Sequence, residues 1–110
     1  MQFNEYQKKA SETAGYPEPG GMAFIYPTLG LAGEAGEVAE KIKKVIREEG
    51  GIISSEKRAE IQKELGDVLW YVSEIARQLE LSLDDIATAN IAKLASRKER
   101  GVISGSGDNR

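Results

Sequence analysis

Four acidic residues stand in two pairs with the same spacing, Glu34 with Glu37 and Glu64 with Asp67. Residues three apart share one face of a helix, with their Cβ atoms about 5–6 Å apart. If two such helices pack antiparallel, all four carboxylates can point into one small volume. Carboxylates at that separation repel one another unless a cation lies between them, and hard oxygen ligands select a hard cation. The pattern therefore predicts a site for Mg²⁺, with Mn²⁺ as the alternative ion.

The position of each pair beside the apolar stripe of its helix supports this hypothesis. At about 100° per residue, Glu34 lies roughly 20° from Val45, and Glu64 lies roughly 20° from Ile75. The second acid of each pair lies about 60° further round the helix. A carboxylate at a helix interface is costly unless it is paired or bound to a metal. The alternative interpretation is that both pairs lie on solvated, salt-bridged faces and have only a structural role.

Apolar residues recur at helical spacing in four segments, which predicts an all-α fold. The two long helices that carry the acids are expected at Leu29–Glu48 and Glu56–Leu79. A short helix is expected within residues 2–14, and a fourth from a Ser82 cap to about residue 100. Short connections between these helices indicate a four-helix bundle-like domain. A chain of 110 residues has only a modest core, so we expect homo-oligomerisation to complete it.

Composition divides the chain into three parts. Residues 1–27 combine the first helix with a loop that contains all three prolines. Residues 28–100 form the helical domain that carries the acids. Residues 101–110 are rich in glycine and serine and are expected to form a flexible tail. A lid or a partner-binding segment is the alternative interpretation of this tail.

Three glycines recur every third residue early in the first acid-bearing helix, at Gly30, Gly33 and Gly36. Each costs up to about 1 kcal/mol relative to alanine in a helix interior. Such a run is typical of close approach by another backbone or by a ligand. Thr28, directly before the run, is the expected N-cap of this helix.

Aromatic residues suggest further contacts. Trp70 falls roughly opposite the apolar stripe of its helix, so we expect it to be exposed and to mark a subunit contact. Three more aromatic residues cluster around the proline-rich loop and form either a wall for a planar ligand such as a base or a cap over the core: Tyr16, Phe24 and Tyr26.

Charge and residue usage exclude several classes of function. The net charge of −3 argues against a protein that coats nucleic acid. The chain contains no cysteine, so it has neither disulfides nor thiolate metal sites, and it contains no histidine. Any catalysis must therefore use carboxylates, lysines, hydroxyls or metal-bound water. We find no long apolar run and no signal sequence, which predicts a soluble, cytoplasmic protein without membrane contact.

Three stretches, GLAGEAGEVAEKIKK, ELGDVLWYV and NIAKLASR, resemble the MazG-like all-α nucleoside triphosphate pyrophosphohydrolases. The resemblance spans roughly residues 28–101, so residues 28–100 would be the catalytic domain. It implies hydrolysis of a nucleoside triphosphate between the α and β phosphates, giving a monophosphate and pyrophosphate. It also implies a homodimer or homotetramer with the site at a subunit interface.

The resemblance further assigns roles to individual residues. The four acidic positions would bind Mg²⁺, and they match Glu34, Glu37, Glu64 and Asp67. Tyr71, one turn after the last acid, would contact the substrate. An asparagine and a lysine on the last helix match Asn90 and Lys93. Some relatives surround the base with tryptophans, whereas this chain has Trp70 alone, and not on the acidic face.

The chemistry is consistent with these residues. Phosphoryl transfer needs charge neutralisation and in-line positioning more than it needs a special nucleophile. The leaving pyrophosphate could be neutralised by Lys44, Lys93 or Arg97. The base that deprotonates water stays open among the four carboxylates and Glu40. Two alternatives remain: a pyrophosphohydrolase restricted to one specialised nucleotide such as phosphoribosyl-ATP or dUTP, and a non-catalytic helical oligomerisation or regulatory module.

Overall fold

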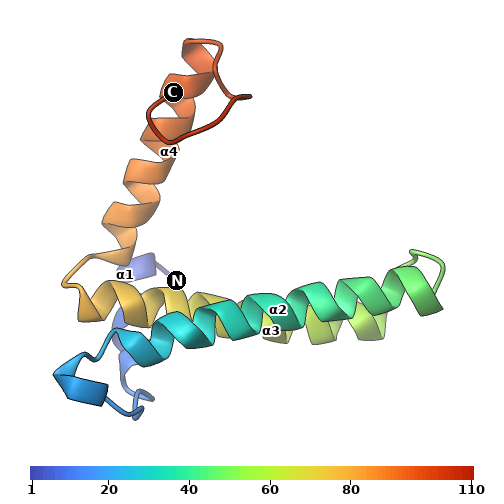
Figure 1. Cartoon of the computed structure of the whole chain (residues 1–110), viewed down its shortest axis with the longest axis horizontal. Coiled ribbons are helices and arrows are strands. Elements are labelled where there is room, and N and C mark those ends of the chain that lie inside the picture. Colours follow the sequence, from blue (N-terminus) through green and yellow to red (C-terminus); the bar gives the residue numbers. More distant parts are fainter.

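The computed structural model describes all 110 residues and contains helices but no strands, as predicted. Two long helices form an antiparallel hairpin, a short helix packs beside it, and a last helix projects away from it (Figure 1). None of the helices has the length and hydropathy that a membrane crossing would require. The helices are α1 at Phe3–Ser11, α2 at Ile25–Glu48, α3 at Ser55–Gln78 and α4 at Leu83–Glu99, with a single 3-10 turn, η1, at Pro19–Gly21.

The α2–α3 hairpin carries the acidic pairs, and local sequence explains most of its limits. Helix α2 ends before Gly50 and Gly51, whose φ angles of 63° and 80° reverse the chain at little steric cost. Ser54 caps α3, since its side chain accepts a hydrogen bond of 3.1 Å from the backbone N–H of Lys57.

The start of α2 differs from the prediction. The helix begins at Ile25, and Thr28 is inside it, donating its hydroxyl to the carbonyl of Phe24 at 2.7 Å. The predicted N-cap role of Thr28 is therefore wrong. Pro27 fits in this first turn because the first backbone N–H groups of a helix have no intrahelical partner.

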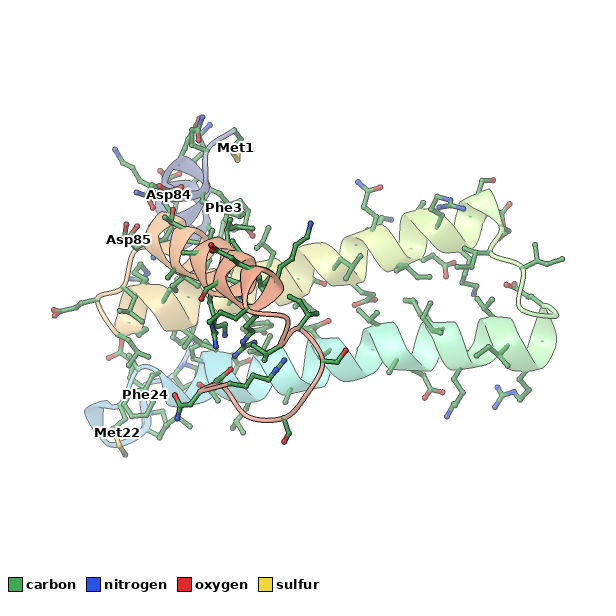
Figure 2. The ribbon with its side chains drawn as sticks, turned by 90° about the horizontal axis from the view of Figure 1, so that it is seen from above. Met1, Phe3, Met22, Phe24, Asp84 and Asp85 are labelled. Carbon is green, nitrogen blue, oxygen red and sulfur yellow. The ribbon has the colours of Figure 1, made fainter.

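Helix α1 is tied to the start of α4 by side-chain caps. The Asn4 carbonyl oxygen accepts hydrogen bonds from the Ser82 hydroxyl at 2.8 Å and the Asp84 N–H at 3.1 Å. The Gln7 carbonyl oxygen accepts one from the Leu83 N–H at 3.0 Å. Figure 2 shows Asp84 near Phe3, at the end of the hairpin where these bonds form. Helix α4 therefore starts from a defined anchor.

Trp70 on α3 anchors the end of α1 and the residues that follow it. Its indole N–H donates to the carbonyl of Ala10 at 3.2 Å and to the hydroxyl of Thr13 at 3.0 Å. The ring is half-buried and lies edge-on to Tyr16, with centroids 6.2 Å apart. The predicted exposure of Trp70 is therefore wrong, because the N-terminal segment covers this side of α3. A subunit contact near Trp70 stays a prediction.

One chain leaves its four helices open. The radius of gyration is 16.9 Å, whereas a compact chain of this length would have about 13 Å. Only eight residues are buried. Large apolar side chains remain exposed on α2, α3 and α4, including Ile42, Leu65, Ile86, Ile91 and Leu94. A single chain therefore does not close a bundle, because α4 turns away from the hairpin (Figure 1).

Candidate metal centre

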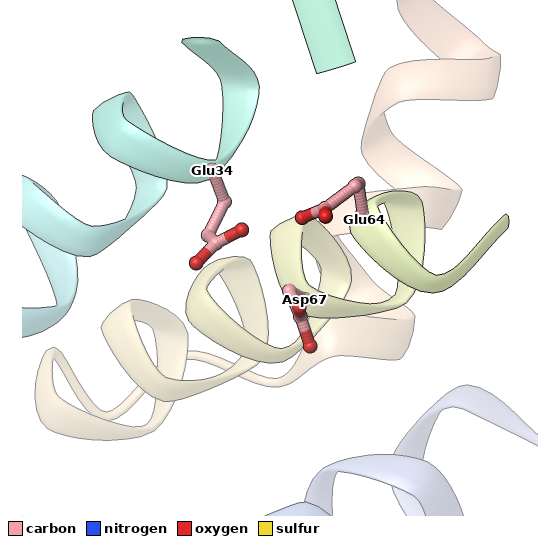
Figure 3. Close-up of side chains that lie close together, drawn as sticks. All are labelled: Glu34, Glu64 and Asp67. Carbon is pink, nitrogen blue, oxygen red and sulfur yellow. The ribbon is translucent and has the colours of Figure 1, made fainter. Parts of the chain in front are cut away.

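Three carboxylates from two helices meet on the α2–α3 hairpin. Glu34 comes from α2, and Glu64 and Asp67 come from α3 (Figure 3). One oxygen of each lies within 4.8 Å of the others. Glu34 and Glu64 are half-buried, while Asp67 is exposed. Antiparallel packing thus brings together acids that are about 30 positions apart in the sequence.

The donor set fits a small hard cation. In an octahedral Mg²⁺ site, oxygens at about 2.1 Å from the ion are at most about 4.2 Å apart. A spread of up to 4.8 Å therefore needs only small side-chain rotations. With three carboxylates and no nitrogen or sulfur donor, the group favours Mg²⁺ or Mn²⁺ over softer metals.

Mutual repulsion within the group affects the pKa of one of its members. The pKa of Glu34 is raised above its ordinary value of 4.5, chiefly by a hydrogen bond shared with Glu64, then by burial and the charge of Asp67. A shared proton thus relieves part of the repulsion when no divalent ion is bound. A cation that replaces that proton would neutralise the same charges.

Lys41 pairs with acids of α3, a contact that was not predicted from the sequence. Its ammonium lies 3.8 Å from a carboxylate oxygen of Glu64 and 3.9 Å from one of Glu60. The signal was present in the sequence, because Lys41 is seven residues after Glu34 and so shares its helix face. The lysine partly balances the acidic group from the side of α2.

Glu37 lies outside the group in this chain. It is exposed, one turn after Glu34 on α2, and its charge adds a smaller contribution to the raised pKa of Glu34. Three of the four predicted metal ligands are therefore brought together. Glu37 stays a predicted ligand that lies outside the group.

Tyr71 packs beside the acidic group against the backbone of α2. A Cβ atom built on Gly30 would lie 2.3 Å from Cε1 of the Tyr71 ring, so only glycine leaves room for it. Gly30 thus makes room for a side chain and not for another backbone as predicted, while the approach of a ligand to the glycines stays a prediction. A Cβ built on Gly33 or Gly36 would meet nothing within 4 Å. Burial, then the charges of Tyr26, Glu34 and Asp67, raises the pKa of Tyr71.

The aromatic cluster beside Tyr71 packs against α3. Tyr16 stacks on Tyr26 with ring centroids 5.6 Å apart, and its hydroxyl donates to the buried carboxylate of Glu74 at 2.9 Å. Arg77 completes this network through an ion pair of 2.7 Å with Glu74. Tyr16 therefore caps the core, while Tyr26 keeps 44% of its surface exposed.

The remaining predicted substrate residues do not meet the acids within one chain. Asn90 and Lys93 lie on α4, which projects away from the hairpin (Figure 1). Lys44 is exposed on α2, ten residues beyond Glu34 and so about 15 Å along the helix axis. Instead, the ammonium of Lys93 lies 3.4 Å from a carboxylate oxygen of Asp108 in the tail.

Two comparisons with known proteins found similar sequences. A family model described as "MazG nucleotide pyrophosphohydrolase domain" matches residues 27–102. The chain is also 51% identical over 114 residues to the "Gene 37 protein" of Mycobacterium phage L5, and the match covers the full length of both. No solved structure matches the chain.

Proposed function

Because the chain belongs to the MazG nucleotide pyrophosphohydrolase family, we propose that it hydrolyses a nucleoside or deoxynucleoside triphosphate between the α and β phosphates. The products are a nucleoside monophosphate and pyrophosphate. The observation that carries this proposal is the group of three carboxylates from two helices, with oxygens within 4.8 Å of one another. Its physiological role would be removal of unwanted nucleotides from the pool.

Most residues of the site can be given a role in this reaction. Glu34, Glu64 and Asp67 hold a divalent ion, which when bound supplies charge neutralisation for the phosphate oxygens. Tyr71, fixed against Gly30, orients its hydroxyl beside the carboxylates, where it can donate to a phosphate oxygen. Water cleaves the anhydride, and its proton passes to a carboxylate of the site, with the choice among Glu37, Glu40 and the clustered acids left open.

The substrate contacts on α4 come from a second copy of the chain. This assembly is supported by the direction of α4, which carries Asn90 and Lys93 away from the acids of its own hairpin (Figure 1). It is also supported by exposed apolar side chains on α4 and on the hairpin, such as Leu94 and Leu65. A homodimer or homotetramer would bury these faces and complete the bundle.

A panel of nucleoside and deoxynucleoside triphosphates, assayed with Mg²⁺ for monophosphate and pyrophosphate, tests the activity. Glu64→Gln is expected to lower turnover at least about 100-fold, since it removes a metal ligand. The matched control is Glu60→Gln, one turn earlier on α3, because Glu60 also pairs with Lys41 but lies outside the carboxylate group. Turnover of one nucleotide alone would indicate a specialised enzyme. If no nucleotide is cleaved by the unaltered protein, the proposal fails.

Complementation between subunits tests the assembly. Mixed oligomers of Glu64→Gln and Lys93→Ala chains contain sites built from one intact acidic group and one intact α4. If α4 acts across the interface, mixing two inactive variants restores about a quarter of full activity in a dimer. No recovery on mixing would show that each site is made by one chain.

A further inference from the structure

The C-terminal segment 101–110 folds back along α4 and is held there by specific hydrogen bonds (Figure 1). Gly101, with φ of 71°, ends the helix, and the Val102 N–H bonds to the Arg97 carbonyl at 2.9 Å. The Arg110 guanidinium then donates to the carbonyls of Val102, Ile103 and Gly107. These bonds close the segment into a loop that places Asp108 over the side of α4.

Asp108 faces two cations of α4. Its carboxylate oxygen lies 3.2 Å from Nη2 of Arg97 and 3.4 Å from Nζ of Lys93. Its backbone carbonyl accepts a second bond from the same Nη2 at 2.9 Å. The guanidinium and the ammonium hold the pKa of Asp108 below its ordinary range. The negative group of the tail thus occupies a position between two positive groups four residues apart.

Arg97 has binding capacity that the tail leaves unused. Its side chain is only 5% exposed, and its Nε atom has no hydrogen-bond partner. Both tail contacts fall on Nη2, so the Nε–Nη2 edge is not engaged in the bidentate way that a guanidinium favours. A tetrahedral phosphate, with more oxygens than one carboxylate, can bind both nitrogens and the Lys93 ammonium together.

Lys93 and Arg97 are cations that we expect to neutralise the phosphates of the substrate, and we propose that Asp108 is an internal competitor that occupies them in place of a phosphate group of a di- or triphosphate. The tail must move for the anion to enter. This inference rests on the proposed function only in identifying the phosphate as part of the nucleotide or of the pyrophosphate product. It makes the tail an autoinhibitory segment that raises the concentration of anion needed for binding.

Binding of inorganic pyrophosphate in EDTA, measured by isothermal titration calorimetry, tests this competition. Without divalent ions, the carboxylates of α2 and α3 repel the anion, so a change in affinity on altering Asp108 or Lys93 reports on the cations of α4. Asp108→Asn is expected to bind pyrophosphate about three- to fivefold more tightly than the unaltered chain, since exposed ion pairs have effects of this size. The double variant Asp108→Asn/Lys93→Gln should lose this gain.

Two controls separate competition from net charge. Glu99→Gln removes a negative charge from the end of α4 that has no ion pair or side-chain hydrogen bond, and it should change affinity less than twofold. A chain that ends at Ser104 loses one aspartate and one arginine, so its net charge is unchanged. This shortened chain keeps Val102, which bonds to the end of α4, and should bind pyrophosphate at least as tightly as Asp108→Asn.

Equal affinity of Asp108→Asn and the unaltered chain would overturn the inference, and so would undetectable binding by every variant. A gain matched by Glu99→Gln would also overturn it, because net charge alone would then explain the effect. No hydrolysis is measured in EDTA, so these outcomes leave the proposed activity untouched. Conversely, a protein that cleaves no nucleotide but shows the expected gain would refute the activity and keep the anion site.

Discussion

Alanine at Gly30 is the sharpest test of how the hairpin positions Tyr71. The new Cβ would lie 2.3 Å from Cε1 and 2.4 Å from Cζ of the ring, whereas carbon atoms in contact are about 3.5–4.0 Å apart. The ring must therefore move by more than about 1 Å. In a helix alanine is favoured over glycine by up to about 1 kcal/mol, but overpacking costs about 1–3 kcal/mol.

The expected net effect of Gly30→Ala is a loss of about 1 kcal/mol in the free energy of unfolding. In a chain of this size, that loss lowers the melting temperature by about 4–8 °C. Gly36→Ala and Gly66→Ala are matched controls, because both glycines are helical and a Cβ there would meet nothing within 4 Å. Both controls should be stabilised by about 0.5–1 kcal/mol.

Thermal and urea unfolding of the three variants measure these differences. The double variant Gly30→Ala/Tyr71→Ala should be no less stable than Tyr71→Ala alone, since removal of the ring relieves the clash. If Gly30→Ala raises the melting temperature as much as the two controls do, the ring does not rest on the α2 backbone. The packing argument for Tyr71 would then be refuted.

Three further predictions concern the acids, Trp70 and the Tyr71 hydroxyl. Because the pKa of Glu34 is raised above 4.5 in the folded chain, the metal-free protein binds more protons folded than unfolded. Its unfolding free energy should therefore fall as the pH rises from about 4.5 through the raised pKa of Glu34 in the folded chain. Urea unfolding in EDTA at a series of pH values should show this fall. The variant Glu34→Gln should not show it. Trp70→Phe removes the indole bonds to Ala10 and Thr13 and should cost about 1–3 kcal/mol, measured by urea unfolding; an unchanged stability would show that α1 is held elsewhere. Tyr71→Phe removes a hydroxyl that makes no hydrogen bond within the chain, so the melting temperature should stay constant while turnover falls about tenfold; equal turnover would remove Tyr71 from the site.

Local patterns predicted much of the fold. Helical periodicity identified all four helices, and the cap at Ser82 was predictable because a hydroxyl at an N-cap satisfies a nearby N–H of the first turn. Spacing alone placed Glu64 and Asp67 on one face of α3, since residues three apart are neighbours on any helix. The start of α2 was misread because Pro27 suggested a loop, although proline is tolerated in a first turn.

Contacts between elements were beyond such patterns. The direction of Trp70 relative to the apolar stripe was read correctly, but its partner is α1, about 60 residues earlier in the chain. A helical period gives an angle around one axis and says nothing about which segment will cover that side. The same limit applies to the tail, whose composition indicates flexibility while Asp108 and Arg110 bind specific groups on α4 and in the loop.

The residue types of the chain define the chemistry available at the site, because they supply hard oxygen ligands in two acidic pairs on two helices and neither histidine nor thiol. Which of those acids meet depends on how the helices pack. The axial register of α2 against α3 places Glu34 close to Glu64 and leaves Glu37 outside the group. That register depends on the turn at Gly50–Gly51 and on the packing of the Tyr71 ring against Gly30. Those constraints act between helices, and no periodicity within one helix contains them.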